Sequence, residues 1–154
     1  MKPKKLRIGV VGYCPPTKFD ENKAREHIKD AYNKIKKDFP EHEITIVAGI
    51  TNVGVLKLAY EEAKKRNWRT AGVGCKKAYE FDWFPTDEEP IIIGNDWGDE
   101  SNVFIYGTRQ AGHPHEKGLD ALIRIGDGKQ SLKETDEIKS MGKPAYEYEL
   151  EKIK

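Results

Sequence analysis

Short apolar runs alternate with amphipathic segments along most of the chain. Runs of strand length that are almost entirely apolar are typical of strands buried on both faces of a sheet. In the segments between them, apolar residues recur with the spacing of one buried helix face. This pattern predicts strands at 6–12, 44–48, 70–74, 91–93, 121–125 and 145–148, and helices at 20–39, 53–67 and 131–141.

Residue types at the ends of these segments support the predicted boundaries. Asp20 is a favourable N-cap for the first helix, and Pro40 follows its end. Asn67 suits the left-handed position that ends the second helix. Segment 94–118 has no clean period, and its apolar run 103–106 fits either a strand or a short helix.

The order of strands and helices predicts the fold. Strands and helices that alternate with short turns favour parallel pairing, with crossover helices on both faces of the sheet. We therefore expect one Rossmann-like, doubly wound α/β domain with a mainly parallel sheet over residues 1–154. Ligands of such sheets bind beyond the carboxyl ends of the strands, where the strand order reverses. The turns expected there are 12–17, 49–54 and 126–131.

The charge and composition exclude several classes of protein. The 27 Lys and Arg residues nearly balance 26 Asp and Glu residues, whereas binding through phosphate neutralisation needs a basic excess, so a nucleic-acid partner is disfavoured. No stretch approaches the roughly 20 apolar residues of a membrane span. Two cysteines are too few for a disulfide framework, and no secretory signal is recognisable. We therefore expect a cytoplasmic protein without a membrane partner.

The last of the three turns has the features of an anion site. Gly126 and Gly128 allow the backbone to turn sharply and to approach a ligand closely. Exposed N–H groups at the start of the following helix attract an anion such as a phosphate, and Lys129 or Ser131 could add a donor. Asp127 places a negative charge near the same position, which opposes an anion.

The turn at 49–54 has a similar design, and two such turns could embrace a nucleotide-sized ligand. Neither turn contains a Walker A sequence or the dinucleotide-binding glycine pattern, so the spacing predicts a phosphate site and no particular cofactor. The candidate ligand-binding residues are Gly12, Tyr13, Gly49, Thr51, Asn52, Gly126, Asp127, Gly128, Lys129, Gln130 and Ser131.

Four segments are similar, in order along the chain, to motifs of one known family. GDGKQSLKE at 126–134 resembles a Pro-Gly-Gly-x-Gly-Thr-x-x-Glu motif, and DALI at 120–123 resembles the Asp-Ala-Phe-Ile strand before it. VAGITNVGVL at 47–56 is similar to a Gly-Gly-Gly-x-x-Gly-Leu-Met segment, and AGVG at 71–74 to the next strand. These motifs belong to the Lonely Guy (LOG) family, formerly labelled lysine decarboxylase-like. That family is part of the SLOG superfamily, together with the DNA-processing protein DprA.

The resemblance implies a Rossmann-like domain that binds a nucleotide or nucleotide-derived small molecule. In enzymes of the family the reaction is hydrolysis of the N-glycosidic bond of a nucleoside 5′-monophosphate, and by analogy Glu134 is the catalytic carboxylate. This sequence lacks the Met-x-x-Arg-Lys segment that carries an active-site arginine in those enzymes. Our first hypothesis is therefore a protein that senses, sequesters or carries its ligand. Phosphoribohydrolase activity is the alternative, and DprA-like binding of single-stranded DNA is a weaker one because the net charge is near zero.

Structural roles compete with these site assignments. Ser131 and Glu134 have the spacing of a capping box, in which both side chains satisfy backbone donors at a helix start. Thr51 or Asn52 could be the N-cap of the following helix. Tyr13 could stack on a base or cover the edge of the sheet.

Four aromatic residues and two acidic residues also have two interpretations each. The aromatic side chains could form a lid over an aromatic base or a contact within a homodimer or higher homo-oligomer. The acidic pair could bind ribose hydroxyls or a metal, although acidic residues also favour a solvated helix start. The aromatic residues are Tyr79, Phe81, Trp83 and Phe84, and the acidic residues are Asp99 and Glu100.

The histidines and cysteines give weaker signals. His113 and His115 flank a proline between glycines, a pattern typical of an exposed turn, and no further ligands accompany them, so no metal site is predicted. Cys14 and Cys75 each follow a predicted strand and could be neighbours in space. Each is expected to be a buried or half-buried thiol, since no adjacent histidine activates it.

Overall fold

The computed structural model describes residues 4–153, which contain eight strands, four α-helices and one 3₁₀ helix. The strands are β1 (Lys5–Gly12), β2 (Lys18–Phe19), β3 (Glu43–Ala48), β4 (Arg69–Gly74), β5 (Ile91–Ile92), β6 (Ala121–Ile125), β7 (Ala145–Tyr148) and β8 (Lys152–Ile153). The helices are α1 (Glu21–Asp38), α2 (Gly54–Lys65), α3 (Ser101–Tyr106) and α4 (Lys129–Ser140), and the 3₁₀ helix is η1 (Lys76–Glu80).

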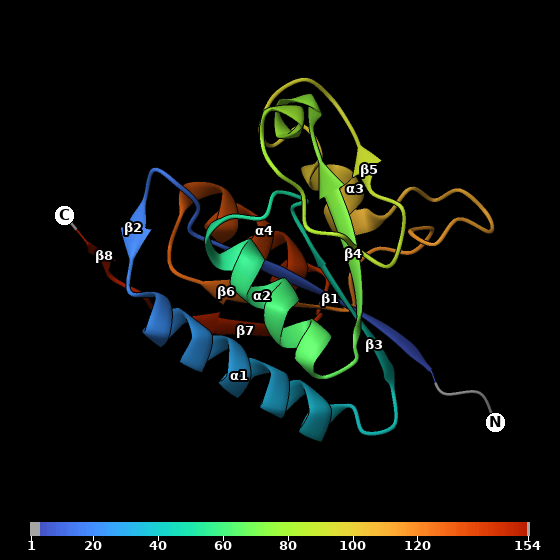
Figure 1. The fold of residues 1–154 in the computed structure, drawn as a ribbon. Helices are drawn as coiled ribbons and strands as arrows, with labels where there is room; N and C mark the ends of the chain where they lie inside the picture. Colours follow the sequence, from blue (N-terminus) through green and yellow to red (C-terminus); the bar gives the residue numbers. More distant parts are fainter. Residues whose placement is uncertain (1–3, 154) are drawn as a thin grey trace.

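Six strands form one parallel sheet in the order β5-β4-β3-β1-β6-β7. The order reverses at β1, which pairs with β3 on one side and with β6 on the other (Figure 1). Ile8 of β1, for example, lies beside Ile46 of β3 and Ala121 of β6. The turns after β1, β3 and β6 are therefore neighbours at the carboxyl edge of the sheet. The predicted doubly wound, Rossmann-like α/β fold is confirmed.

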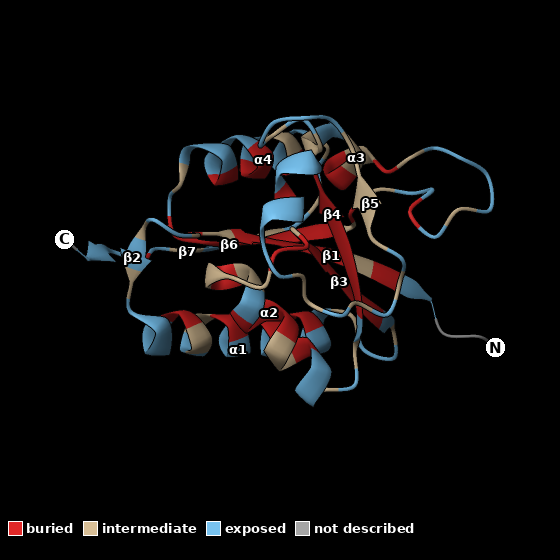
Figure 2. Cartoon of the chain, turned by 45° about the horizontal axis from the view of Figure 1, so that its top comes forward, coloured by how far each residue is buried: buried red, intermediate tan, exposed pale blue. Residues whose placement is uncertain are grey.

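The helices cover both faces of the sheet (Figure 2). Successive side chains of a strand point to opposite faces of the sheet, so residues of β1 contribute to the packing on both faces. Ile8 and Val10 pack in one apolar cluster with α1 and α2, and Val11 packs in a second cluster with α3 and α4. A buried strand with apolar residues on both faces explains why β1 appears as a nearly continuous apolar run.

The predicted helix ends agree with the structure at α1 and α2. The Asp20 side chain accepts a hydrogen bond of 3.1 Å from the Lys23 amide and so caps α1. Asn67 has a φ of 60°, the left-handed conformation expected just beyond α2. No helix in the described part of the chain combines the length and apolar content needed to cross a membrane.

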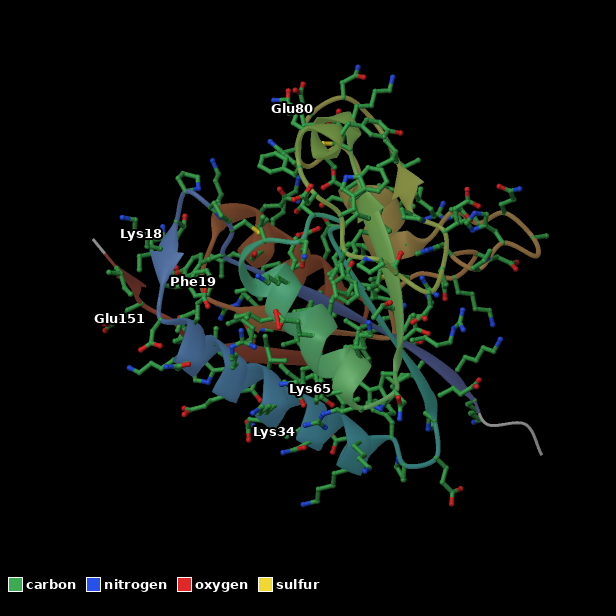
Figure 3. All side chains as sticks on the ribbon, in the orientation of Figure 1. Lys18, Phe19, Lys34, Lys65, Glu80 and Glu151 are labelled. Carbon is green, nitrogen blue, oxygen red and sulfur yellow. The ribbon has the colours of Figure 1, made fainter. Side chains whose placement is uncertain are left out.

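Two regions differ from or add to the predicted elements. The ambiguous run 103–106 is part of α3, a helix of six residues. The short strands β2 and β8 pair antiparallel in a separate two-stranded sheet, where Lys18 and Phe19 lie near Glu151 (Figure 3). Strands of two residues are too short for an alternation pattern to reveal.

We predict that Tyr60 of α2 stabilises the pairing of the carboxyl end of β3 with β4. Its side chain is fully buried, and its hydroxyl lies 3.0 Å from the Ala48 carbonyl oxygen, 2.9 Å from that of Gly49 and 2.9 Å from that of Ala71. Tyr60→Phe leaves these carbonyls with less hydrogen bonding, so it should lower the free energy of unfolding by about 1–2 kcal/mol in urea titration.

Tyr79→Phe is the matched control, because the Tyr79 side chain is exposed. The control should unfold at the wild-type urea concentration. Equal stability of Tyr60→Phe and Tyr79→Phe would contradict the role given to the buried hydroxyl.

Candidate functional site

A cavity of about 350 Å³ opens at the carboxyl edge of the sheet, where strand order reverses. This volume is in the range of small-molecule sites. We call it the strand-end pocket. Its walls come from the ends of β1 and β4, the turn after β3 and the first turns of α4. Six of the residues predicted from the sequence line it, namely Gly12, Gly49, Thr51, Gln130, Ser131 and Glu134.

The other six predicted residues lie outside the lining of the pocket, and Tyr13 is the clearest example. Its ring is 4% exposed, and its hydroxyl donates a hydrogen bond to the Asp127 carboxylate. The same hydroxyl accepts a bond of 3.0 Å from the Asp127 amide. Both expected roles of Tyr13 are therefore wrong, because the ring is buried beneath the turn after β6 and follows the central strand of the sheet. The residues outside the lining are Tyr13, Asn52, Gly126, Asp127, Gly128 and Lys129.

The Asp127 carboxylate does not point into the strand-end pocket, contrary to the charge conflict expected from the sequence. It is bound by Tyr13 and borders a shallow hollow next to 149–152. The hydrogen bond from Tyr13 lowers the pKa of Asp127, and the Lys152 ammonium contributes to the same shift. Asp127 is therefore a charged residue that orders its own turn.

Helix α4 begins at Lys129, before the predicted start at 131, and this corrects the capping-box interpretation. Its N-cap is Gly128, which has no side chain, so Ser131 lies inside the first turn and Glu134 in the second. The earlier start follows from a tight turn at Gly126, whose φ is 91° and whose carbonyl accepts a hydrogen bond from Arg124. Within residues 4–153, the amides of 129–131 have no hydrogen-bond acceptor.

In the turn after β3, unlike at the start of α4, backbone amides already have hydrogen-bond acceptors within the protein. The Asn52 amide donates to the Asp82 carbonyl (2.9 Å), and the Val55 amide donates to the Tyr13 carbonyl (2.9 Å). The N-cap of α2 is Val53, without a side-chain bond, so neither Thr51 nor Asn52 is the cap. Two amides of this turn are thus already bonded, and the turn contributes mainly walls to the pocket.

Glu134 is a buried carboxyl group at one side of the strand-end pocket. It is 4% exposed, and Ser101 donates a hydrogen bond of 2.6 Å to its Oε2 atom. Burial raises the pKa of Glu134 to about 7, and the neighbouring Glu100 carboxylate raises it as well. Burial also raises the pKa of Glu100, which lines the same pocket. The site therefore holds two carboxyl groups, one of which exchanges a proton near neutral pH.

Several lining residues were missed or only partly recognised. The two acidic residues at 99–100 have different roles. Asp99 accepts hydrogen bonds from the loop amides of Asn95 and Asp96, whereas Glu100 lines the pocket. Cys14 lines the pocket, and burial raises its thiol pKa to about 11, which keeps it protonated at neutral pH. Trp97 also lines the pocket, although segment 94–118 has no period that would have revealed it.

The four aromatic residues expected in a lid have separate roles. Phe81 lines the pocket, and Phe84 stacks on Tyr60, with ring centroids 4.7 Å apart. Trp83 stacks on Tyr79 and donates a hydrogen bond of 2.7 Å to the Ala78 carbonyl. The expected lid therefore reduces to Phe81, which Trp97 accompanies.

The histidine pair lies at the opposite end of the sheet. His115 is buried, and its Nδ1 atom lies 2.6 Å from the Arg7 guanidinium, which also bonds Glu88 at 3.2 Å. Burial lowers the pKa of His115 to about 3, so the ring is neutral and accepts a bond from Arg7. Across residues 4–153, no three His, Cys, Asp or Glu side chains are grouped as metal ligands would be.

Comparisons with known proteins identify the class of fold. No protein-family model and no curated protein matches the chain. Two structures of the molybdenum cofactor carrier protein from Chlamydomonas reinhardtii match with TM-scores of 0.58 and 0.54 at 19% identity. The molybdenum cofactor binding protein from the phototrophic bacterium Rippkaea orientalis matches with a TM-score of 0.59 at 21% identity. Each match covers 94% of this chain and 76% of the other.

At this level of identity the comparisons show a shared fold. The chain shares the Rossmann-like α/β architecture of these carrier proteins. Membership of the LOG family itself, which the motifs suggested, stays a prediction.

The raised pKa of Glu134 predicts a specific pH dependence of stability. The unfolded chain ionises this group near 4.5 and the folded chain near 7, so the folded state binds more protons between these values. Stability from this group is therefore greatest below pH 4.5 and is lost as the pH rises to about 7. Glu134→Gln, which stays neutral, should gain up to about 3 kcal/mol relative to wild type over that range.

Urea unfolding at pH 5 and pH 8 measures this gain. Asp136→Asn is the matched control, since Asp136 is an exposed carboxylate on the same helix. The control should keep a constant difference from wild type. A constant difference for Glu134→Gln as well would show that Glu134 titrates as an ordinary glutamate.

Proposed function

We propose that this protein binds a phosphorylated, nucleotide-type small molecule in the strand-end pocket and carries or sequesters it. The observation that carries this proposal is the amino end of α4. Its first-turn amides have no acceptor within residues 4–153, and its residues Gln130 and Ser131 line the pocket. Free amides and the helix dipole together form a favourable position for a phosphate.

The charge distribution places the phosphate near the rim of the pocket. Among the described residues, no Lys or Arg lines the pocket, whereas Glu100 and Glu134 do. A phosphate deep in the pocket would meet these carboxyl groups, but a phosphate at the start of α4 meets backbone amides and lies near the exposed Lys129. The largely apolar remainder of the pocket suits the uncharged part of the ligand.

The comparison proteins support a carrier role. They are described as molybdenum cofactor carrier and binding proteins, and their fold extends over nearly all of this chain. The molybdenum cofactor is thus a ligand to include beside nucleotides in any binding panel. A protein that senses this ligand, rather than carrying it, would bind it in the same pocket.

A second candidate function is hydrolysis of the N-glycosidic bond of a nucleoside 5′-monophosphate. The observation that favours it is Glu134, a pocket carboxyl group with a pKa of about 7. Such a group is available as a proton donor to a leaving base or as a carboxylate beside an oxocarbenium-like centre. Water would add to the sugar carbon while the base leaves with a proton.

Chromatography of nucleoside monophosphates after incubation separates the two functions. Release of free base by wild type and by Asp136→Asn, but not by Glu134→Gln, would establish hydrolysis. Binding without base release would leave the carrier function.

Replacement of Gly128 tests the phosphate position directly. Gly128→Asp places a carboxylate at the N-cap, where it can accept bonds from the same amides that a phosphate would use. A Cβ at this position meets nothing closer than 3.7 Å, and the extended backbone suits a capping residue. The variant should be more stable by about 0.3 kcal/mol, yet bind ribose 5-phosphate at least about 10-fold more weakly by calorimetry.

Gly128→Ala is the control, because it adds a Cβ without a charge. It should retain wild-type affinity. If Gly128→Asp binds ribose 5-phosphate as well as Gly128→Ala does, the phosphate does not lie at α4. If the wild type binds no phosphorylated ligand of the panel, the proposed function is wrong.

A further inference from the structure

Two aromatic side chains from separate segments meet where the strand-end pocket opens to solvent. Phe81 follows η1, and Trp97 lies in the loop before α3. Their ring centroids are 5.9 Å apart, and both residues line the pocket. They are nevertheless 45% and 50% exposed, respectively. Large apolar rings at a pocket opening offer flat surfaces on which another ring can stack.

The backbone around these rings is held in place by specific bonds. The Lys76 amide donates to the Gly94 carbonyl (3.0 Å), and the Lys77 ammonium pairs with Asp96 (3.0 Å). These contacts join η1, which follows the end of β4, to the loop that carries Trp97 (Figure 1). Asp99 further orders that loop by accepting the Asn95 and Asp96 amides at 3.0 Å and 2.9 Å. The aromatic pair is therefore supported before any ligand binds.

Glu100 adds a polar group to the same surface. It follows Trp97 by three positions and lines the pocket, and its Oε2 atom accepts the Gly98 amide at 3.2 Å. The bond from Gly98 fixes the orientation of the carboxylate. A carboxylate offers two oxygens with several acceptor positions, so it recognises a ligand edge with adjacent N–H donors.

The aromatic pair and the start of α4 are close enough to contact one ligand. A Cβ added to Gly98 would lie 3.7 Å from Oε1 of Gln130, which is in the first turn of α4. Gly98 lies between Trp97 and Glu100 in the sequence. A ring beside Trp97 and a phosphate on the α4 amides can therefore belong to the same molecule.

We propose that Phe81, Trp97 and Glu100 form a subsite for a planar nitrogen heterocycle that presents adjacent N–H donors, such as the ring N–H and the 2-amino group of guanine and pterins. The Trp97 ring stacks on the heterocycle, the Phe81 ring, which is tilted by 57° to that of Trp97, packs beside it, and Glu100 accepts hydrogen bonds from its N–H groups. This inference rests on the proposed function, because it assigns the ring of the ligand whose phosphate lies at α4.

Trp97→Ala tests the stacking, with guanosine 5′-monophosphate and ribose 5-phosphate as probes in calorimetry. Stacking of a base on an aromatic side chain contributes about 1–3 kcal/mol, so affinity for the nucleotide should fall roughly 5- to 150-fold. Affinity for ribose 5-phosphate, which has no ring to stack, should not change. Tyr79→Ala is the matched control, since Tyr79 is more exposed than Trp97 and lies outside the pocket lining.

Glu100→Gln tests recognition of the ring edge. Wild type should prefer guanosine 5′-monophosphate over inosine 5′-monophosphate, which lacks the 2-amino group, and Glu100→Gln should lose most of that preference. Glu80→Gln is the control, because Glu80 is exposed on the outer side of η1 (Figure 3).

The outcomes separate this inference from the proposed function. Equal affinity of wild type and Trp97→Ala for guanosine 5′-monophosphate would overturn the stacking. The same conclusion would follow if wild type bound guanosine 5′-monophosphate no more tightly than ribose 5-phosphate. No preference between the two nucleotides in wild type would overturn the role of Glu100. Failure of wild type to bind either phosphorylated probe would instead remove the proposed function.

Discussion

Tyr13 connects the three turns that meet at the centre of the sheet. Its carbonyl accepts the Val55 amide at the start of α2, and its hydroxyl bonds both the amide and the carboxylate of Asp127 after β6. These contacts require small neighbours, because a Cβ on Gly54 would lie 2.4 Å from the Tyr13 carbonyl oxygen and one on Gly126 would lie 2.5 Å from its ring. One buried residue after β1 thereby joins the start of α2 to the turn that precedes α4.

In this arrangement the polar groups near the pocket have different surroundings, and therefore different roles. Asp127 is bound to Tyr13, so its charge orders the turn and does not compete for the α4 amides. The amides of 129–131 are left for a ligand, and they are preorganised because the helix itself fixes them. Glu100 and Glu134 lie in the pocket beyond them, where burial raises the pKa of each. The result, within the part of the chain that the structure describes, is a pocket with unbonded helix amides at one end and carboxyl groups in its interior.

The sequence predicts the fold well and the site in part. The apolar runs of β1, β3, β4 and β6 are local signals, and a ligand site at their carboxyl ends follows from strand order alone. The turn that precedes α4 is less evident from the sequence, since it includes a contact between Tyr13 and Asp127, which are 114 positions apart. Trp97 and Glu100 lie in a segment without periodicity, and tertiary contacts such as Lys77 with Asp96 bring them to the pocket.

Amide chemical shifts of nitrogen-15-labelled protein titrated with ribose 5-phosphate test the central claim most directly. We expect saturable shifts concentrated at residues 128–131, because a phosphate bound there accepts hydrogen bonds from these N–H groups. The chemical shifts of the α1 amides should not change, because α1 lies on the other face of the sheet from α4. Saturable shifts centred away from the start of α4, or none at all, would contradict a phosphate position at these amides.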